Sequence, residues 1–88
     1  MDIRDFLSVM RLLKAFYIDW PFDFSDKVQV STWYAYLGGM EFEKLKKVVN
    51  FYISKNDMGP NNPGELLKAQ IEHDLKQMIN AGDLEGDE

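Results

Sequence analysis

The sequence predicts an all-α fold, a compact four-helix orthogonal bundle with a short acidic C-terminal tail. Three observations indicate this class. Apolar residues recur at spacings of three and four along four segments, which is the period of amphipathic helices. Prolines or glycines separate these segments. The hydrophobic content of 45% and the aromatic content of 14% suffice for a packed core.

The first predicted helix runs from Ile3 to Phe16, with Asp2 as its N-cap. Pro21 ends this region because proline disfavours helical geometry at the residue before it and lacks a backbone donor. The aromatic residues of the following linker, Phe22 and Phe24, are expected to cover the core. The alternative is an exposed aromatic docking patch.

The second predicted helix begins after Ser25, a good N-cap residue, and carries an apolar face through Leu37. A short strand over Lys27–Thr32 is the local alternative, because β-branched and polar residues alternate there. The helix is preferred because the helical period continues beyond that segment. Gly38 and Gly39 are expected to end the helix in a left-handed cap.

The third helix is expected to start near Glu41. The fourth is expected to start after Asn62, with Pro63 at its first position. Glu65, three residues after Asn62, would complete a variant of the capping box. Gly82 is expected to end the fourth helix. Its predicted apolar stripe comprises Leu67, Ile71, Leu75, Met78 and Ile79. The residues expected to build the core are Trp33, Leu37, Phe42, Leu45, Val49 and Tyr52.

Charge and length restrict the function. The 88 residues make one domain, expected to be a helical domain over 1–80 with a flexible acidic tail over 81–88. The net charge of −5 becomes −1 without the four acidic residues of the tail, Asp83, Glu85, Asp87 and Glu88. A nearly neutral body lacks the basic surface that binds phosphates, so we expect no direct nucleic-acid binding. No signal peptide and no membrane span is predicted, so we expect a soluble protein of the cytoplasm.

No arrangement of residues predicts catalysis, so we expect a protein that is not an enzyme and has no metal, cofactor or small-molecule substrate. The chain has no cysteine, and its single histidine, His73, is expected to face solvent from a helix rather than act as a general base. Gly38 and Gly39 are not followed by the residues of a phosphate-binding loop. The basic cluster of Lys44, Lys46 and Lys47 is expected to be a solvated helix face.

The end of the fourth helix is the most informative feature. Apolar residues there precede four acids in the last six residues, a combination that suits binding in a groove of another protein. The alternative is that this helix simply packs back on the other three. The predicted partner-binding residues are Leu75, Met78, Ile79, Asp83, Leu84 and Glu85.

Several features of the sequence, taken together, resemble the phage replicative-helicase loader and inhibitor family. They are an amphipathic first helix, the linker of Tyr17 and Trp20–Phe22, Trp33 with Leu37, a third helix ending in Asn50–Ile53, and the loop containing Pro60 and Pro63 before Glu65 and Leu66. The resemblance covers most of residues 1–70. It implies a phage replication protein with an all-helical domain and no enzymatic activity. Its partners would be the hexameric replicative helicase and the replication initiator. The resemblance implies that the protein holds the helicase inactive and delivers it to the origin-bound initiator.

Two differences from the family stand out. The segment after Leu75 is shorter than the family's helicase-gripping segment, and the loop from Gly59 to Pro63 is longer. Two other functions remain open. An acidic inhibitor of another host protein that mimics DNA would need acids over one folded face. A single-stranded DNA binder would use Trp20, Phe22 and Phe24 as stacking platforms.

Overall fold

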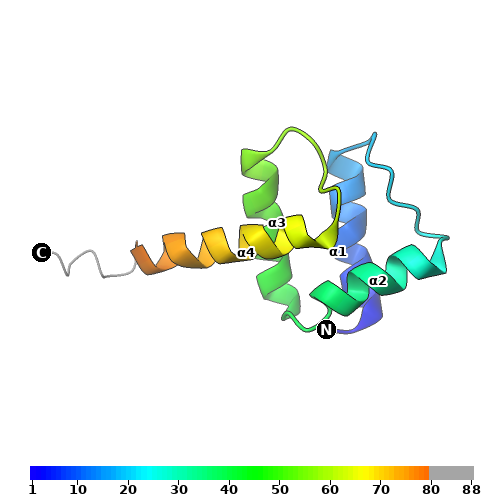
Figure 1. Ribbon diagram of the computed structural model, residues 1–88, viewed down its shortest axis with the longest axis horizontal. Helices are drawn as coiled ribbons and strands as arrows, with labels where there is room; N and C mark the ends of the chain where they lie inside the picture. The colour runs from blue at the N-terminus through cyan, green and yellow to red at the C-terminus, as the bar shows by residue number, and fades with distance from the viewer. Residues whose placement is uncertain (80–88) are drawn as a thin grey trace, which may run out of the picture.

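The computed structural model describes residues 1–79, and these residues form four helices and no strand. The helices are α1 (Ile3–Phe16), α2 (Lys27–Leu37), α3 (Phe42–Lys55) and α4 (Pro63–Met78). Helices α1 and α3 lie side by side, and α2 and α4 cross them at steep angles (Figure 1). The predicted four-helix orthogonal bundle is therefore confirmed. The predicted acidic tail, 81–88, lies outside the described residues.

One hydrophobic core joins all four helices. Five of the six residues expected to build it are buried, and the sixth, Phe42, is half-buried against it. Lys27–Thr32 belongs to helix α2, so the strand alternative is wrong. No charged or polar residue of the described chain is fully buried. The buried hydrophobic residues are Phe6, Val9, Met10, Leu13, Tyr17, Trp20, Phe22, Trp33, Leu37, Leu45, Val48, Val49, Tyr52, Leu66 and Ala69.

The first helix has the predicted bounds, and its N-cap is the predicted one. The Asp2 carboxylate accepts a hydrogen bond from the Arg4 backbone N–H at 2.9 Å, which satisfies one of the free donors of the first turn. Met1 is held against the end of α2, because its ammonium group donates to the Gly38 carbonyl and its own carbonyl accepts from the Tyr34 hydroxyl. The N-terminus therefore closes the contact between α1 and α2.

The predicted N-cap of α2 is wrong by one residue. Asp26 caps the helix, and its Oδ1 accepts hydrogen bonds from the backbone N–H groups of Val28 and Gln29, both at 3.1 Å. The Ser25 hydroxyl is used elsewhere, since it donates to Asp23 Oδ1 at 2.7 Å. Ser25 and Asp26 could each cap the helix. Because the Ser25 hydroxyl is bonded to Asp23 in the preceding turn, Asp26 takes the N-cap position.

The predicted left-handed cap at the end of α2 is also wrong. Gly38 has a φ of −68°, and no described residue has a positive φ. The helix ends where expected, but its last turn continues in right-handed geometry, with the Met40 N–H bonded to the Leu37 carbonyl at 3.1 Å. Close packing explains this glycine: a Cβ at Gly38 would lie 2.8 Å from the Tyr34 ring.

The aromatic linker after α1 belongs to the core. Trp20 stacks on Phe22, with ring centroids 4.8 Å apart, and meets Trp33 edge-on at 5.6 Å. Trp20 and Phe22 are each only 4% exposed, which confirms that the linker covers the core. Neither ring is free to stack on bases. The hypothesis of a single-stranded DNA binder therefore lacks two of its three proposed stacking residues.

Three side chains tie the loop between α3 and α4 to the rest of the bundle. The Tyr17 hydroxyl donates to the Asn56 carbonyl at 2.8 Å, and the Tyr52 hydroxyl donates to the Met58 carbonyl at 2.8 Å. Trp20 Nε1 donates to the Pro60 carbonyl at 2.7 Å. The bonds from Tyr17 and Trp20 fix the loop against the end of α1 and the linker that follows it, and the bond from Tyr52 fixes the loop against α3.

Gly59 is expected to be the least replaceable glycine of this loop. A Cβ there would lie 2.5 Å from Cδ1 of the buried Trp20 indole, a clash that the packed ring cannot relieve. Gly59→Ala should therefore lower the free energy of unfolding by about 1–3 kcal/mol. Gly39→Ala is the matched control, since nothing lies within 4 Å of its Cβ position. Urea unfolding measures both, and equal stabilities of the two variants would contradict this packing.

Candidate docking face on helix α4

The inner side of helix α4 joins the core. Pro63, Leu66 and Ala69 are buried, and Leu67, the first residue of the predicted apolar stripe, is partly buried against the core. Pro63 takes the first helical position as predicted. The predicted capping box is wrong, because Asn62 makes no side-chain cap bond and the Glu65 carboxylate instead accepts from the Tyr52 hydroxyl at 3.2 Å.

A second set of contacts holds the middle of α4 on α3. The His73 ring meets Phe51 edge-on, with ring centroids 5.6 Å apart. Lys44 Nζ lies 2.7 Å from Asp74 Oδ1, and His73 Nδ1 lies 3.4 Å from the same oxygen. The hydrogen bond from Lys44, followed by that from His73, lowers the pKa of the Asp74 carboxyl. These contacts anchor α4 as far as residue 74.

The prediction that His73 faces solvent is wrong. Its side chain is only 14% exposed because it lies on the same side of α4 as Leu66 and Ala69, at spacings of three and four residues. The polar contact of His73 is with Asp74, whose carboxylate also pairs with Lys44. His73 therefore has a packing role in the fold.

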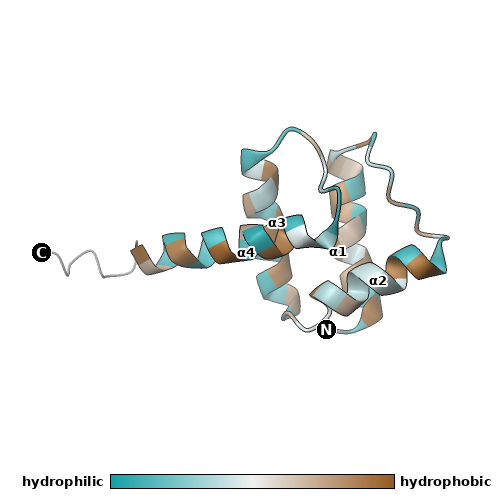
Figure 2. Cartoon of the chain, in the orientation of Figure 1, coloured by the Kyte–Doolittle hydropathy of each residue, from teal (hydrophilic) through white to brown (hydrophobic). Residues whose placement is uncertain are grey.

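The outer side of α4 is apolar as well. Ile71, Leu75, Met78 and Ile79 are between 53% and 64% exposed, and we call these four residues the outer face. At about 3.6 residues per turn they lie roughly opposite Leu66, Ala69 and His73. Figure 2 shows hydrophobic residues continuing along α4 beyond its crossing with α3. Helix α4 thus packs with one apolar side and presents another.

The structure places the predicted site residues in two groups. Leu75, Met78 and Ile79 lie together on the outer face, as expected, and Ile71 extends it by one turn. Asp83, Leu84 and Glu85 lie outside the described residues. The inner residues Leu66 and Ala69 were missed by sequence reasoning, although their spacing to His73 is the signal that could have found them.

Charged residues on the flank of the outer face alternate in sign. Lys68, Glu72 and Lys76 follow one another at spacings of four, so their alternating charges give the flank little electrostatic field of its own. Residues 1–79 hold eleven acids and ten bases. Strong electrostatic attraction of a partner would therefore have to come from the acids of 83–88.

The Tyr52 hydroxyl predicts an alkaline pH dependence. Burial, then the charge of Glu65 and the hydrogen bond to it, raises the pKa of this phenol above its usual value of 10.0. Its contribution to stability is therefore complete below pH 10 and lost as the pH rises beyond that value. Tyr52→Phe should cost about 1 kcal/mol at pH 7 and flatten the loss of stability above pH 10. Tyr36→Phe, at a 60% exposed position, is the control. An unchanged alkaline slope in Tyr52→Phe would refute this assignment.

Within residues 1–79, no three His, Asp or Glu side chains come together as a metal site. None of the helices in that part of the chain has the length and apolar character to cross a bilayer. The chain matches no protein-family model, no curated protein and no solved structure. The fold and the site define a small all-α protein with an exposed apolar face on helix α4.

Proposed function

We propose that this protein is a docking protein that inserts the outer face of α4 into an apolar groove of a partner. The observation that carries the proposal is the division of α4 into a packed inner side and an exposed outer side with Ile71, Leu75, Met78 and Ile79. Large apolar side chains gathered on a surface mark interaction sites. An amphipathic helix laid in a groove is a recurrent mode of recognition that reads residues at this spacing.

The anchoring of α4 makes the outer face suitable for this role. The contacts of His73 with Phe51 and of Asp74 with Lys44 hold the helix at two positions between Ile71 and Leu75. The helix is therefore already formed before a partner binds, and binding does not carry the entropy cost of folding it. The acids that follow in sequence, from Asp83 to Glu88, would speed association with a groove that has a basic rim.

The partner we propose is a hexameric replicative helicase, held inactive or loaded by the protein and bridged to the replication initiator. The resemblance of residues 1–70 to the phage helicase loader and inhibitor family supports this choice, as does the absence of catalytic motifs from the sequence. The site of action would be the cytoplasm of a phage-infected cell.

Co-elution of the purified chain with a bacterial replicative helicase on size exclusion, together with the helicase's ATPase rate, tests this function. We expect a complex at micromolar protein and a lowered ATPase rate. The double substitution Leu75→Ser/Met78→Ser should weaken binding by roughly 30-fold or more, because each buried apolar side chain contributes on the order of 1–2 kcal/mol. Val28→Ser, at a 75% exposed position away from α4, is the matched control.

Two results would overturn the proposal. Failure of the wild-type chain to bind helicase or initiator would remove the proposed partners. Binding that survives both the outer-face substitution and deletion of residues 83–88 would remove the proposed surface. The rival function, a DNA-mimicking inhibitor, has less support, because residues 1–79 hold nearly equal numbers of acids and bases.

A further inference from the structure

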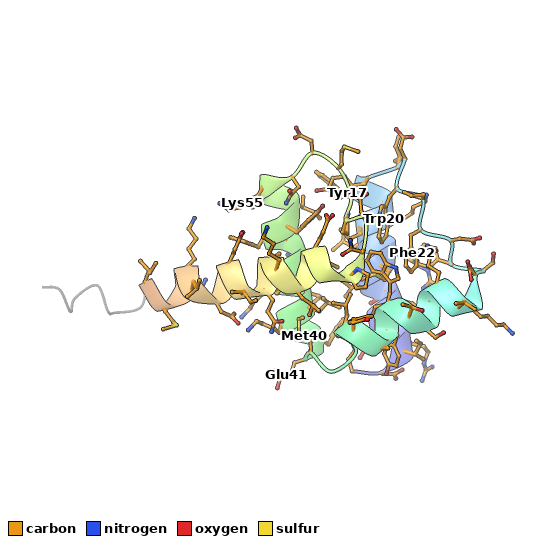
Figure 3. The ribbon with its side chains drawn as sticks, viewed as in Figure 1. Tyr17, Trp20, Phe22, Met40, Glu41 and Lys55 are labelled. Atoms are coloured by element: carbon orange, nitrogen blue, oxygen red, sulfur yellow. The ribbon has the colours of Figure 1, made fainter. Side chains whose placement is uncertain are left out.

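A second exposed apolar surface lies away from the outer face of α4. It is a hollow of about 330 Å³ between the end of α1 with its following linker and the loop that joins α3 to α4. Figure 3 shows Tyr17 and Trp20, two of its lining residues, beside that loop. The hollow adjoins the C-terminal end of α1, and Figure 1 shows that this end of α1 lies far from the C-terminal end of α4.

Large apolar side chains line this hollow yet remain exposed. Ile18 is 77% exposed, Met58 73% and Phe16 58%. They come from two segments about 40 residues apart, so no helical period in the sequence indicates that they meet. Scattered exposed apolar residues are ordinary, but a group of three around one hollow marks an interaction surface.

The hollow is formed in advance of any ligand. Its two walls are held together by the hydrogen bonds from Tyr17 to the Asn56 carbonyl and from Trp20 to the Pro60 carbonyl. Gly59 lies directly against the indole of Trp20. A ligand would therefore find the site in place, without the cost of ordering a loop.

The charged residues that line the hollow are all acidic. Asp19 and Asp57 belong to its lining, and no lysine or arginine does. Lys14 donates to the Trp20 carbonyl and the Lys55 ammonium lies 5.3 Å from the centroid of the Phe51 ring, and neither lysine belongs to the lining. Besides burial, the charge of Asp57 raises the pKa of the Tyr17 hydroxyl. A cation that enters the hollow would meet carboxylates as the charged groups of its lining.

We propose that the hollow binds a segment of another protein in which a large apolar side chain stands beside arginine or lysine. The apolar side chain would lie among Phe16, Ile18 and Met58, and the cation would reach the carboxylates of Asp19 and Asp57. A volume of 330 Å³ is at the lower end for ligand pockets, which suits one or two side chains of a peptide. Nucleic acid is disfavoured by the same carboxylates.

The proposal can be tested by NMR titration of the ¹⁵N-labelled protein with two blocked tetrapeptides, acetyl-Arg-Leu-Phe-Arg-amide and acetyl-Glu-Leu-Phe-Glu-amide. The basic peptide should shift the Trp20 indole N–H and the Gly59 amide saturably, and the acidic peptide should not. Asp19→Asn/Asp57→Asn should weaken the basic peptide about three- to tenfold, the effect of two exposed ion pairs. Ile18→Ser/Met58→Ser should abolish saturation, and Val28→Ser should leave it unchanged.

The proposal fails if no saturable shift occurs up to about 10 mM basic peptide, the weak end of measurable affinities. It also fails if both peptides bind equally, or if the shifts survive Ile18→Ser/Met58→Ser. Shifts of the same signals on raising the protein concentration alone would instead assign the hollow to a second copy of the chain. The outer-face variant Leu75→Ser/Met78→Ser should bind the basic peptide like the wild type, so the two surfaces are tested separately.

Discussion

Replacing Trp20 by alanine is expected to destabilise the protein by about 3–5 kcal/mol. Trp20 is 4% exposed, stacks on Phe22 and meets Trp33 edge-on. Its Nε1 also donates to the Pro60 carbonyl at 2.7 Å, so the substitution removes core volume and a tie between two loops at once. Small domains are stable by about 5–15 kcal/mol, and this loss would be a large part of the whole.

Urea unfolding followed by the fluorescence of the remaining Trp33 measures this effect. Trp20→Phe separates its two components, because it keeps an aromatic ring but leaves the Pro60 carbonyl without its donor. We expect Trp20→Phe to cost about 1–3 kcal/mol and therefore less than Trp20→Ala. A loss below about 1 kcal/mol for Trp20→Ala would place it outside the range for buried aromatic residues and contradict the buried position of the linker.

The second large effect is expected at Leu45 in α3. This side chain is fully buried in the core that joins the helices. Leu45→Ala should cost about 2–5 kcal/mol, from the lost burial and the cavity left behind. For a domain of this size, that corresponds to a fall in the melting temperature of roughly 10 °C or more.

Leu75→Ala is the matched control, because it makes the same chemical change on the outer face, where the leucine is 53% exposed. Its free energy of unfolding should stay within about 0.5 kcal/mol of the wild-type value, although partner binding should weaken. Similar losses of stability in the two variants would mean that α4 buries its outer face in the folded protein.

The parts of the fold that could be predicted are those in which one periodic pattern controls the structure. Helices α1 and α3 each bury one apolar stripe, so their faces follow from spacing, and Asp2 is the only good cap at the start of α1. The linker residues Phe22 and Phe24 are predicted to cover the core, and the structure buries Phe22 and half-buries Phe24 against it.

The errors fall where local signals compete. Ser25 and Asp26 are both good N-caps, and the Asp23 side chain takes the serine. Gly38 suits a left-handed cap by type, but the Tyr34 ring explains the glycine in a right-handed turn. Such choices depend on tertiary neighbours that a single sequence does not display.

The candidate site was predictable for a related reason. Helix α4 carries two apolar sides, and sequence reasoning found the longer one, which includes Leu75 and Met78. The inner side was missed because Ala69 and His73 contribute little to an apolar pattern, although both pack in the structure. The hollow at Ile18 and Met58 could not be predicted at all, since its walls meet only through folding.

Amide hydrogen exchange of the free protein along α4 tests the central claim most directly. If the inner side and the contacts at His73 and Asp74 anchor this helix while its outer face stays open, the amides of Ala69 and His73 should exchange almost as slowly as the core of α3. Those of Met78 and Ile79 should exchange orders of magnitude faster, and the pattern should not depend on protein concentration. Fast exchange from Leu66 onward, or slow exchange through Ile79 that strengthens with concentration, would contradict the claim.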